Sequence, residues 1–126
     1  MFLIDSNVFL EALLKQEQFI KAQQFLESNK PSSLYVTDFT LHSIALLLLK
    51  NKKATLLETF INEVIIDRIQ VLSIETNNLI TVIENARKFN TDFDDAYQYT
   101  VAKKYKLAVV TFDKDFDKTD IKRIEP

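Results

Sequence analysis

The sequence predicts a three-layer α/β/α fold with a central, mostly parallel sheet covered by helices on both faces. Short apolar, β-rich runs alternate with longer runs of helical periodicity along the whole chain, which is typical of parallel sheets. With 126 residues the chain is too short for two independent cores. No internal repeat or linker divides it, so we expect a single domain over residues 1–126.

The chain opens with one short strand and two helices. Residues 2–4 form an apolar run typical of a strand, and this run ends at Asp5. Asn7 is a candidate N-cap for the helix that follows, over residues 8–14. Residues 19–26 repeat apolar side chains at helical spacing, and a polar run that contains a proline ends this second helix.

The middle of the chain adds two strands and two helices. Residues 34–37 have the composition of a strand, and residues 69–74 alternate apolar and polar side chains. Residues 54–66 have helical periodicity. Residues 40–49 are apolar almost all round, so we expect a helix that is buried or covered by a partner.

The last third of the chain repeats the alternation. One helix is expected to begin at Asn77 or Asn78, and a second helix covers residues 96–105. Residues 107–111 are a short β-rich run, and residues 120–124 are a candidate edge strand. Right-handed crossovers place the carboxyl ends of parallel strands at one edge of the sheet, where ligands bind in open α/β folds.

The composition excludes several classes of site. Glycine is absent, which rules out the glycine-rich phosphate loops of P-loop and dinucleotide-binding proteins. Cysteine is absent and His42 is the only histidine, which excludes disulfides, cysteine nucleophiles and histidine-rich zinc sites. The net charge of −2 argues against a surface that binds nucleic acid by bulk positive charge. We expect His42 to be a hydrogen-bonded structural side chain rather than a catalytic base.

The apolar runs of the chain are short. The longest one, residues 44–49, is far below the length that spans a membrane. Asp5 interrupts the N-terminal apolar run too early for the core of a signal peptide. We therefore expect a cytoplasmic protein without membrane association.

Aspartates follow three of the expected strands. Asp5, Asp38 and Asp113 each lie at or just after the carboxyl end of a strand, and three more aspartates lie within residues 92–95 at the start of a helix. Carboxylates that converge at one sheet edge repel one another, so they require a cation or raised pKa values. Without cysteine and with one histidine, the expected cation is Mg²⁺ or Mn²⁺, which prefer oxygen ligands.

Each of these aspartates also has a purely structural interpretation. An aspartate at a strand end often caps the next helix, and Asp92 or Asp94 could cap the helix over residues 96–105. Asp113 and Asp115 lie in a polar turn, where aspartate is common. The coincidence across separate elements is what favours a shared site.

Three stretches resemble the PIN domain, most of all the small VapC-type ribonuclease toxins of prokaryotic toxin–antitoxin pairs. Residues 3–9 resemble the opening strand of that family, its metal-binding aspartate and the helix that follows. Residues 92–96 resemble its acidic helix start, and residues 109–116 resemble its closing strand and acidic turn. Each motif is short, but together they occur in the family's order and cover essentially the whole chain.

The resemblance implies a set of site residues. Asp5, Asp95 and Asp113 would be the catalytic metal ligands, with Asp94 and Asp115 in support. The polar side chains that would orient carboxylates and water without binding the metal are Ser6, Asn7, Thr111 and Ser43.

One position departs from the family pattern. The family has a fourth acid, usually glutamate, on the helix after its second strand, and Ser43 stands at that place here. A serine hydroxyl is a much weaker Mg²⁺ ligand than a carboxylate. Asp38, at the nearby strand end, is a candidate replacement for the missing charge, and a loss of activity is the alternative.

The function that the resemblance implies is hydrolysis of RNA phosphodiester bonds with Mg²⁺ or Mn²⁺, by the toxin of a type II toxin–antitoxin pair. The expected partners are an RNA substrate, a small antitoxin protein and a second copy of the chain in a homodimer, and the helix over residues 41–49 is a candidate contact surface. An alternative is a catalytically degenerate PIN-like module that binds protein or RNA. A phosphatase or receiver domain fits poorly, because Asp5 has no acidic partner at residues 6–7.

Overall fold

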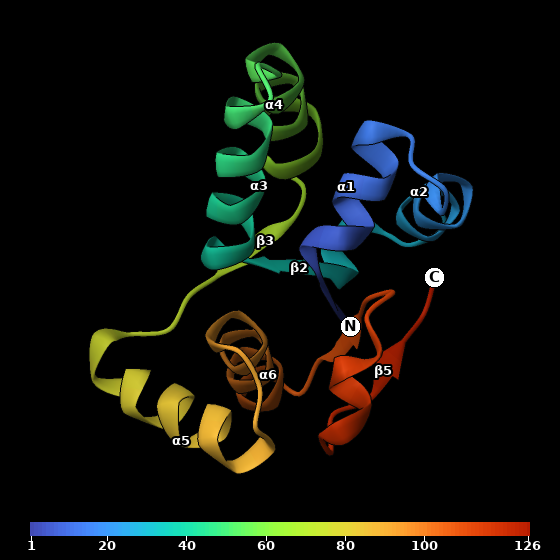
Figure 1. Cartoon of the computed structure of the whole chain (residues 1–126). Helices are drawn as coiled ribbons and strands as arrows, with labels where there is room; N and C mark the ends of the chain where they lie inside the picture. Colours follow the sequence, from blue (N-terminus) through green and yellow to red (C-terminus); the bar gives the residue numbers. More distant parts are fainter.

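The computed structural model describes all 126 residues and contains one five-stranded sheet, in which every pair of neighbouring strands is parallel (Figure 1). The strand order is β3-β2-β1-β4-β5. The strands are β1 (Phe2–Ile4), β2 (Leu34–Thr37), β3 (Gln70–Leu72), β4 (Ala108–Val110) and β5 (Arg123–Ile124). The predicted α/β class is confirmed, although the last three strands are shorter than expected.

Six helices connect the strands. They are α1 (Ser6–Leu14), α2 (Phe19–Ser28), α3 (Asp38–Lys50), α4 (Ala54–Phe60), α5 (Leu79–Phe89) and α6 (Phe93–Tyr105). Short helical turns cover Pro31–Ser33, Ile61–Ile65, Thr76–Asn78 and Lys114–Lys118. The helix predicted over residues 54–66 is therefore two pieces, because α4 changes into a π-helical turn at Ile61–Ile65.

Three helix starts differ from the prediction. Asn7 is not the N-cap of α1: Asp5 takes that position, its side chain accepts from the backbone N–H of Ser6, and Asn7 lies in the first turn. Thr37 caps α3, which therefore begins two residues earlier than expected, at Asp38. Helix α6 also begins earlier, at Phe93, so the acidic segment lies inside its first turn rather than before it.

Three helices end on a residue with left-handed backbone, a conformation that normally favours glycine. The φ angles are 49° at Lys15 after α1, 48° at Asn90 after α5 and 56° at Lys106 after α6. Because the chain has no glycine, lysine and asparagine take these positions.

The sheet separates two hydrophobic cores, which gives the three predicted layers (Figure 1). Adjacent residues of one strand point to opposite faces: Ile4 is buried among α1 to α4, and Leu3 is buried among α5 and α6. In β4, Val110 lies in the same core as Ile4, and Val109 lies in the same core as Leu3. This two-sided burial fixes the strands and therefore the position of the residues that follow them.

Helix α3 is only partly buried. Ile44 and Leu48 lie fully in the core, whereas 73% of Leu46 and 55% of Leu49 are exposed. The helix is therefore not buried all round by its own chain, and its apolar outer face is open in the isolated chain. Its coverage by a partner, the other expectation, stays a prediction. None of the helices is long and apolar enough to cross a membrane.

Candidate active site

The site lies at the carboxyl edge of the two central strands. Asp5 follows β1, and Thr111 and Asp113 follow β4, its neighbour in the sheet. The chain winds to β2 and β3 on one side of β1 and returns to β4 on the other side, so this is the switch point at which open α/β sheets bind ligands. The backbone N–H of Asp5 donates to the carbonyl of Val110 at 3.0 Å, which ties the two strand ends together.

Asp5 is buried and surrounded by neutral donors. Its Oδ1 accepts from the backbone N–H of Ser6 at 2.7 Å and from Nε2 of Gln98 at 2.9 Å, with a longer contact to Ser6 Oγ. Its Oδ2 accepts from Thr111 Oγ1 at 2.7 Å and from Asn7 Nδ2 at 3.1 Å. Burial nevertheless raises the pKa of Asp5, since these neutral donors do not fully offset the loss of hydration.

Asn7 and Thr111 fix the loop after β4 as well as the carboxylate. Asn7 Nδ2 donates to Thr111 Oγ1 at 2.8 Å, and Asn7 Oδ1 accepts from the backbone N–H of Phe112 at 3.2 Å. Thr111 Oγ1 accepts from the backbone N–H of Asp113 at 3.0 Å. The position of Asp113 is therefore set by the same network that orients Asp5.

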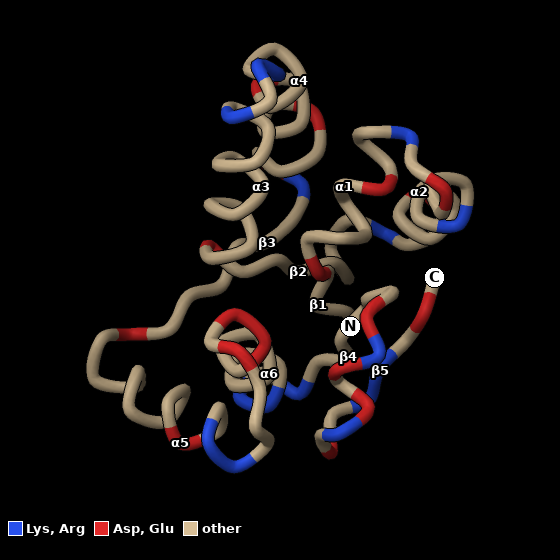
Figure 2. The backbone as a smooth tube through the Cα atoms, in the orientation of Figure 1, with Lys and Arg blue, Asp and Glu red and all other residues tan.

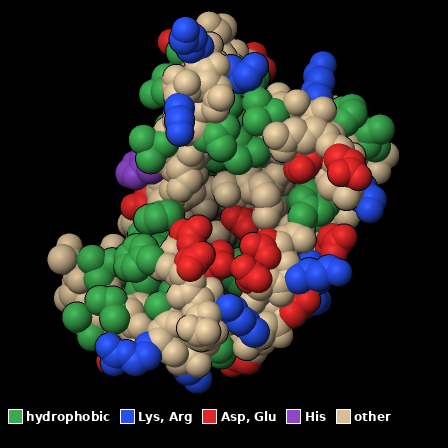
Figure 3. Space-filling model, viewed as in Figure 1, with side chains coloured by type: hydrophobic (Ala, Val, Ile, Leu, Met, Phe, Trp, Pro, Cys, Tyr) green, Lys and Arg blue, Asp and Glu red, His purple; other side chains and the backbone are tan.

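Helix α6 brings the remaining acids to this edge. Asp94 and Asp95 lie in its first turn, where the positive end of the helix dipole favours negative charge. Carboxylate oxygens of Asp95, Asp113 and Asp115 lie within 4.8 Å of one another. Figure 2 shows acidic segments at the starts of α1 and α6 and in the turn after β4, and in Figure 3 the acidic side chains gather in a hollow at the centre of this face.

The acids of the site repel one another strongly. Burial, followed by the charges of Asp94, Asp5, Asp113 and Asp115, raises the pKa of Asp95 from 3.8 to about 7. The ion pairs of the structure involve Asp117, Asp120 and Glu125, so no lysine or arginine neutralises this cluster.

The donor set fits a hard divalent cation. The side chains that converge are carboxylates, without thiolate or imidazole, and oxygen ligands of this kind suit Mg²⁺ and Mn²⁺. A bound cation would also offset the repulsion that raises the pKa of Asp95. Asp95, Asp113 and Asp115 form the exposed side of such a site, and the buried Asp5 lies behind them.

Three residues of α3 are not part of the cluster. Asp38 Oδ1 accepts from the hydroxyl of Tyr97 and from the backbone N–H of Phe39, both at 2.8 Å, and Asp38 is not among the clustered carboxylates. Ser43 is half-buried and makes no side-chain hydrogen bond. His42 is exposed and also makes none, so the expectation of a hydrogen-bonded structural histidine is wrong.

Tyr97 links three elements near the site. Its hydroxyl donates to Asp38 on α3 and accepts from the backbone N–H of Ile74 at 2.8 Å, after β3. Burial and the negative charge of Asp38 raise the pKa of Tyr97 to about 12, so this donor is retained at neutral pH. These hydrogen bonds hold Asp38 beside Tyr97, and its role as a replacement for the fourth acid stays a prediction.

Gln98 was missed by sequence reasoning. It lies one turn after Asp95 on α6, is only 4% exposed, and donates to Asp5. The available signal was a polar side chain three positions after Asp95, in the middle of a helix whose residues 96–102 are all buried.

Comparison with known proteins gives one family. The family model of the PIN domain matches residues 2–122. Among curated proteins, none matches the sequence.

Several solved structures share the fold. The toxin VapC20 from Mycobacterium tuberculosis, described as cleaving the sarcin–ricin loop, superposes with a TM-score of 0.86 at 14% identity over 100% of both chains. FitAcB from Neisseria gonorrhoeae superposes with a TM-score of 0.74 at 24% identity, over 98% of this chain and 96% of that one. A toxin–antitoxin complex from Klebsiella pneumoniae gives a TM-score of 0.68 at 17% identity, over 92% and 90%.

Proposed function

The chain belongs to the PIN domain family, and on that premise we propose that it is a metal-dependent ribonuclease, the toxin of a type II toxin–antitoxin pair, built as a single PIN-like domain over residues 1–126. The observation that carries the proposal is the convergence of Asp5, Asp95 and Asp113 at the switch point of the sheet. The fold shared with VapC20 and with a toxin–antitoxin complex supports it.

In this proposal Asp5, Asp95 and Asp113 hold Mg²⁺ or Mn²⁺, with Asp94 and Asp115 adding negative charge. A divalent cation held by carboxylates lowers the pKa of a bound water and stabilises the charge that develops on a phosphodiester. This chemistry needs no protein nucleophile, which suits a chain without cysteine and with its one histidine exposed and away from the cluster.

The other polar residues of the site act on the carboxylates. Ser6, Asn7 and Thr111 hold both oxygens of Asp5, so its orientation is fixed before any ligand arrives. Asp95 retains a proton near neutral pH in the absence of a cation, and it must release that proton to become a ligand.

A second candidate function rests on Ser43. At the place where the family carries a fourth acid, this chain has a hydroxyl, and Asp38, the nearest replacement, already accepts hydrogen bonds from Tyr97 and Phe39. A site with fewer carboxylates holds a cation more weakly. The alternative is therefore a degenerate PIN-like module that binds RNA or protein without cleaving it.

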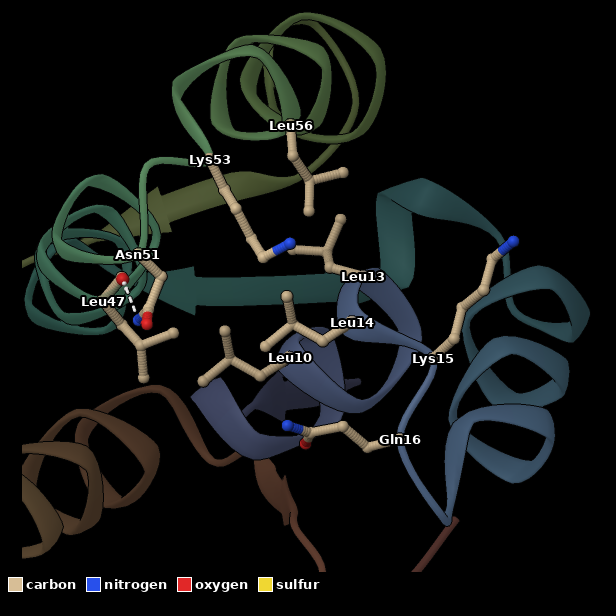
Figure 4. Close-up of a pocket in the computed structure, with 9 residues that line it drawn as sticks. All are labelled: Leu10, Leu13, Leu14, Lys15, Gln16, Leu47, Asn51, Lys53 and Leu56. Atoms are coloured by element: carbon tan, nitrogen blue, oxygen red, sulfur yellow. Dashed lines mark hydrogen bonds between the residues drawn. The ribbon is translucent and has the colours of Figure 1, made fainter.

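The proposed partner is a small antitoxin that covers apolar surface of α1, α3 and α4. A groove of about 650 Å³ lies between these helices (Figure 4). Leu10, Leu13 and Leu14 of α1 face Leu47 and Leu56 across it, and the exposed outer face of α3 adjoins it. We also propose a homodimer, for which this outer face is a candidate surface, and a cytoplasmic location, where RNA substrates occur.

RNA cleavage tests the proposal. Purified protein is incubated with a pool of structured and single-stranded RNA in Mn²⁺, in parallel with an EDTA sample. Asp5→Asn removes a proposed ligand, and Asp67→Asn is the matched control, because Asp67 is exposed and its left-handed backbone suits asparagine.

Cleavage by the wild type and by Asp67→Asn, lost in EDTA and in folded Asp5→Asn, supports a metal-dependent ribonuclease. Full cleavage by folded Asp5→Asn contradicts the proposed site. No cleavage by the wild type together with tight RNA binding favours the degenerate module.

A further inference from the structure

Gln98 is a buried polar side chain that the proposed chemistry leaves without a role. It is 4% exposed and lies on α6 one turn after Asp95. Its Nε2 donates to Asp5 Oδ1 at 2.9 Å, and this is the only hydrogen bond of its side chain.

The other end of the same amide has no partner. Oε1 of Gln98 is the one buried side-chain nitrogen or oxygen atom of the chain without a hydrogen bond. The orientation of the amide is not arbitrary: the donors of Ser6, Asn7 and Thr111 are directed at both oxygens of Asp5, as an ionised carboxylate requires, and Nε2 faces such a carboxylate because it only accepts. A buried carbonyl oxygen without a hydrogen bond is unfavourable. We therefore expect that a hydrogen-bond donor from outside the chain lies beside Oε1 when the site is occupied.

The chain itself supplies no such donor. The charged side chains of the site are carboxylates, and lysine and arginine are absent from the cluster. The donors around Asp5 are Ser6, Asn7 and Thr111, and all of them are directed at Asp5 or at one another. Water molecules carried by a hard divalent cation are donors, since such ions keep several waters when they bind to carboxylates.

The hydrogen bonds of Asp5 give an independent reason to expect that the Gln98 amide changes its partner when a cation binds. A carboxylate has about four lone-pair positions, and those of Asp5 are taken by Ser6, Gln98, Asn7 and Thr111. A cation that binds an oxygen of Asp5 must displace one of these donors.

Three of the four donors are tied to other groups. Ser6 donates through its backbone at the start of α1. Asn7 also bonds Thr111 and Phe112, and Thr111 also accepts from Asp113. Gln98 is the donor that can leave without breaking a second hydrogen bond.

We propose that Gln98 is a positioning residue of the cation site: it holds Asp5 when the site is empty of metal, and with a cation bound its Oε1 accepts a hydrogen bond from the water shell of that cation. This inference rests on the proposed metal-dependent function. It assigns to Gln98 the orientation of cation-bound water, in a chain that carries Ser43 in place of a fourth acid.

The test follows the amide of Gln98 directly by NMR in the full chain. Mg²⁺ is the probe, because it is diamagnetic, and the side-chain amide and 13Cδ signals of Gln98 are assigned by their absence in Gln98→Leu. We expect a saturable downfield shift of 13Cδ as the carbonyl gains a donor, and an upfield shift of the amide protons as the bond to Asp5 is lost. The amide of Gln23, which bonds Glu27 on α2, is the internal reference and should not move.

Calorimetric titration with Mg²⁺ gives a second readout. Gln98→Leu removes the acceptor for cation-bound water and also the donor that the cation must displace from Asp5, so the change in dissociation constant reports the difference between these two hydrogen bonds. We expect a rise of about fivefold, because a water polarised by a divalent cation is the stronger donor by about one ordinary hydrogen bond. Thr100→Val is the matched control on the same helix, because the Thr100 hydroxyl bonds Ala96 and Asn85 and not the site. It should bind Mg²⁺ as the wild type does.

The outcomes separate this inference from the proposed function. Saturable Mg²⁺ binding to the wild type with an unmoved Gln98 13Cδ signal, or with unchanged affinity in folded Gln98→Leu, overturns the role of Gln98 alone. An absence of Mg²⁺ binding to the wild type overturns the metal site itself, and the inference with it.

Discussion

The raised pKa of Asp95 predicts that Mg²⁺ binding depends on pH near neutrality. The pKa of this carboxyl is about 7, and a carboxylate must be deprotonated to bind a cation. The apparent dissociation constant then increases by the factor 1 + 10^(pKa − pH). This factor is about 11 at pH 6 and about 1.1 at pH 8, so binding should be roughly tenfold weaker at pH 6.

Calorimetry at the two pH values measures this effect. Titrations in buffers with different ionisation enthalpies also count the protons released, and we expect about one proton per Mg²⁺ at pH 6 and about a tenth of one at pH 8. Asp67→Asn should retain the full pH dependence, because Asp67 is exposed and outside the cluster. Equal affinity at both pH values, without proton release at pH 6, would refute the assignment of Asp95 as a ligand that titrates near neutrality.

The raised pKa of Asp95 also determines how the free energy of unfolding of the metal-free protein changes with pH. The pKa of Asp95 rises from its ordinary value of 3.8 to about 7 in the folded protein, so between these values the unfolded chain is ionised while the folded chain retains its proton. The free energy of unfolding therefore falls as the pH rises from about 4 to about 7. A fully buried group would give about 4 kcal/mol, and because Asp95 is half-buried we expect on the order of 2 kcal/mol. Urea denaturation across this pH range measures the change, and Mg²⁺ should restore stability most at pH 8.

Three further predictions concern single positions. Ser43→Glu should tighten Mg²⁺ binding about tenfold by calorimetry if a carboxylate there reaches the site, and unchanged affinity would contradict the proposed correspondence with the fourth acid. Thr111→Val removes a donor at 2.7 Å from the buried Asp5, and urea denaturation should show a loss of about 2 kcal/mol. Lys106→Gly should raise the free energy of unfolding by about 1 kcal/mol in the same assay, because its φ of 56° is strained for any residue with a Cβ; a loss of stability would contradict this interpretation.

The fold could be predicted because local patterns and tertiary packing agree along most of the chain. The alternation of strands and helices gives the α/β class, and the strand-end position of Asp5 and Asp113 follows from parallel winding. The first residues of the helices were harder to predict from the sequence. Asn7 has good capping propensity, but its side chain bridges Asp5, Thr111 and Phe112, a long-range network that spacing alone does not reveal.

Some surroundings of the site residues could not be predicted, because they depend on contacts between distant elements. Asp38 looks like Asp5 in the sequence, since both stand where a strand ends, but the hydroxyl of Tyr97, 59 positions along the chain, takes Asp38 as its acceptor. Helix α3 was expected to be buried or covered by a partner because its leucines surround it, and the chain itself buries only the face that meets the sheet. Periodicity cannot distinguish a helix covered by its own chain from one left open.

Asp5 and Asp95 of the proposed site each have an obstacle to binding a cation, and both obstacles involve helix α6. Asp5 has four neutral donors and no lone pair left, so it must lose a hydrogen bond, whereas Asp95 holds a proton near neutral pH and must lose it. The donor that leaves most easily is Gln98, one turn after Asp95 on α6. Because Asp95 and Gln98 both lie in the first two turns of α6, we propose that this helix, as well as the missing acid on α3, influences the affinity for metal. If that is correct, Gln98→Leu and Ser43→Glu should change Mg²⁺ affinity independently, and their effects on the binding free energy should add in the double variant.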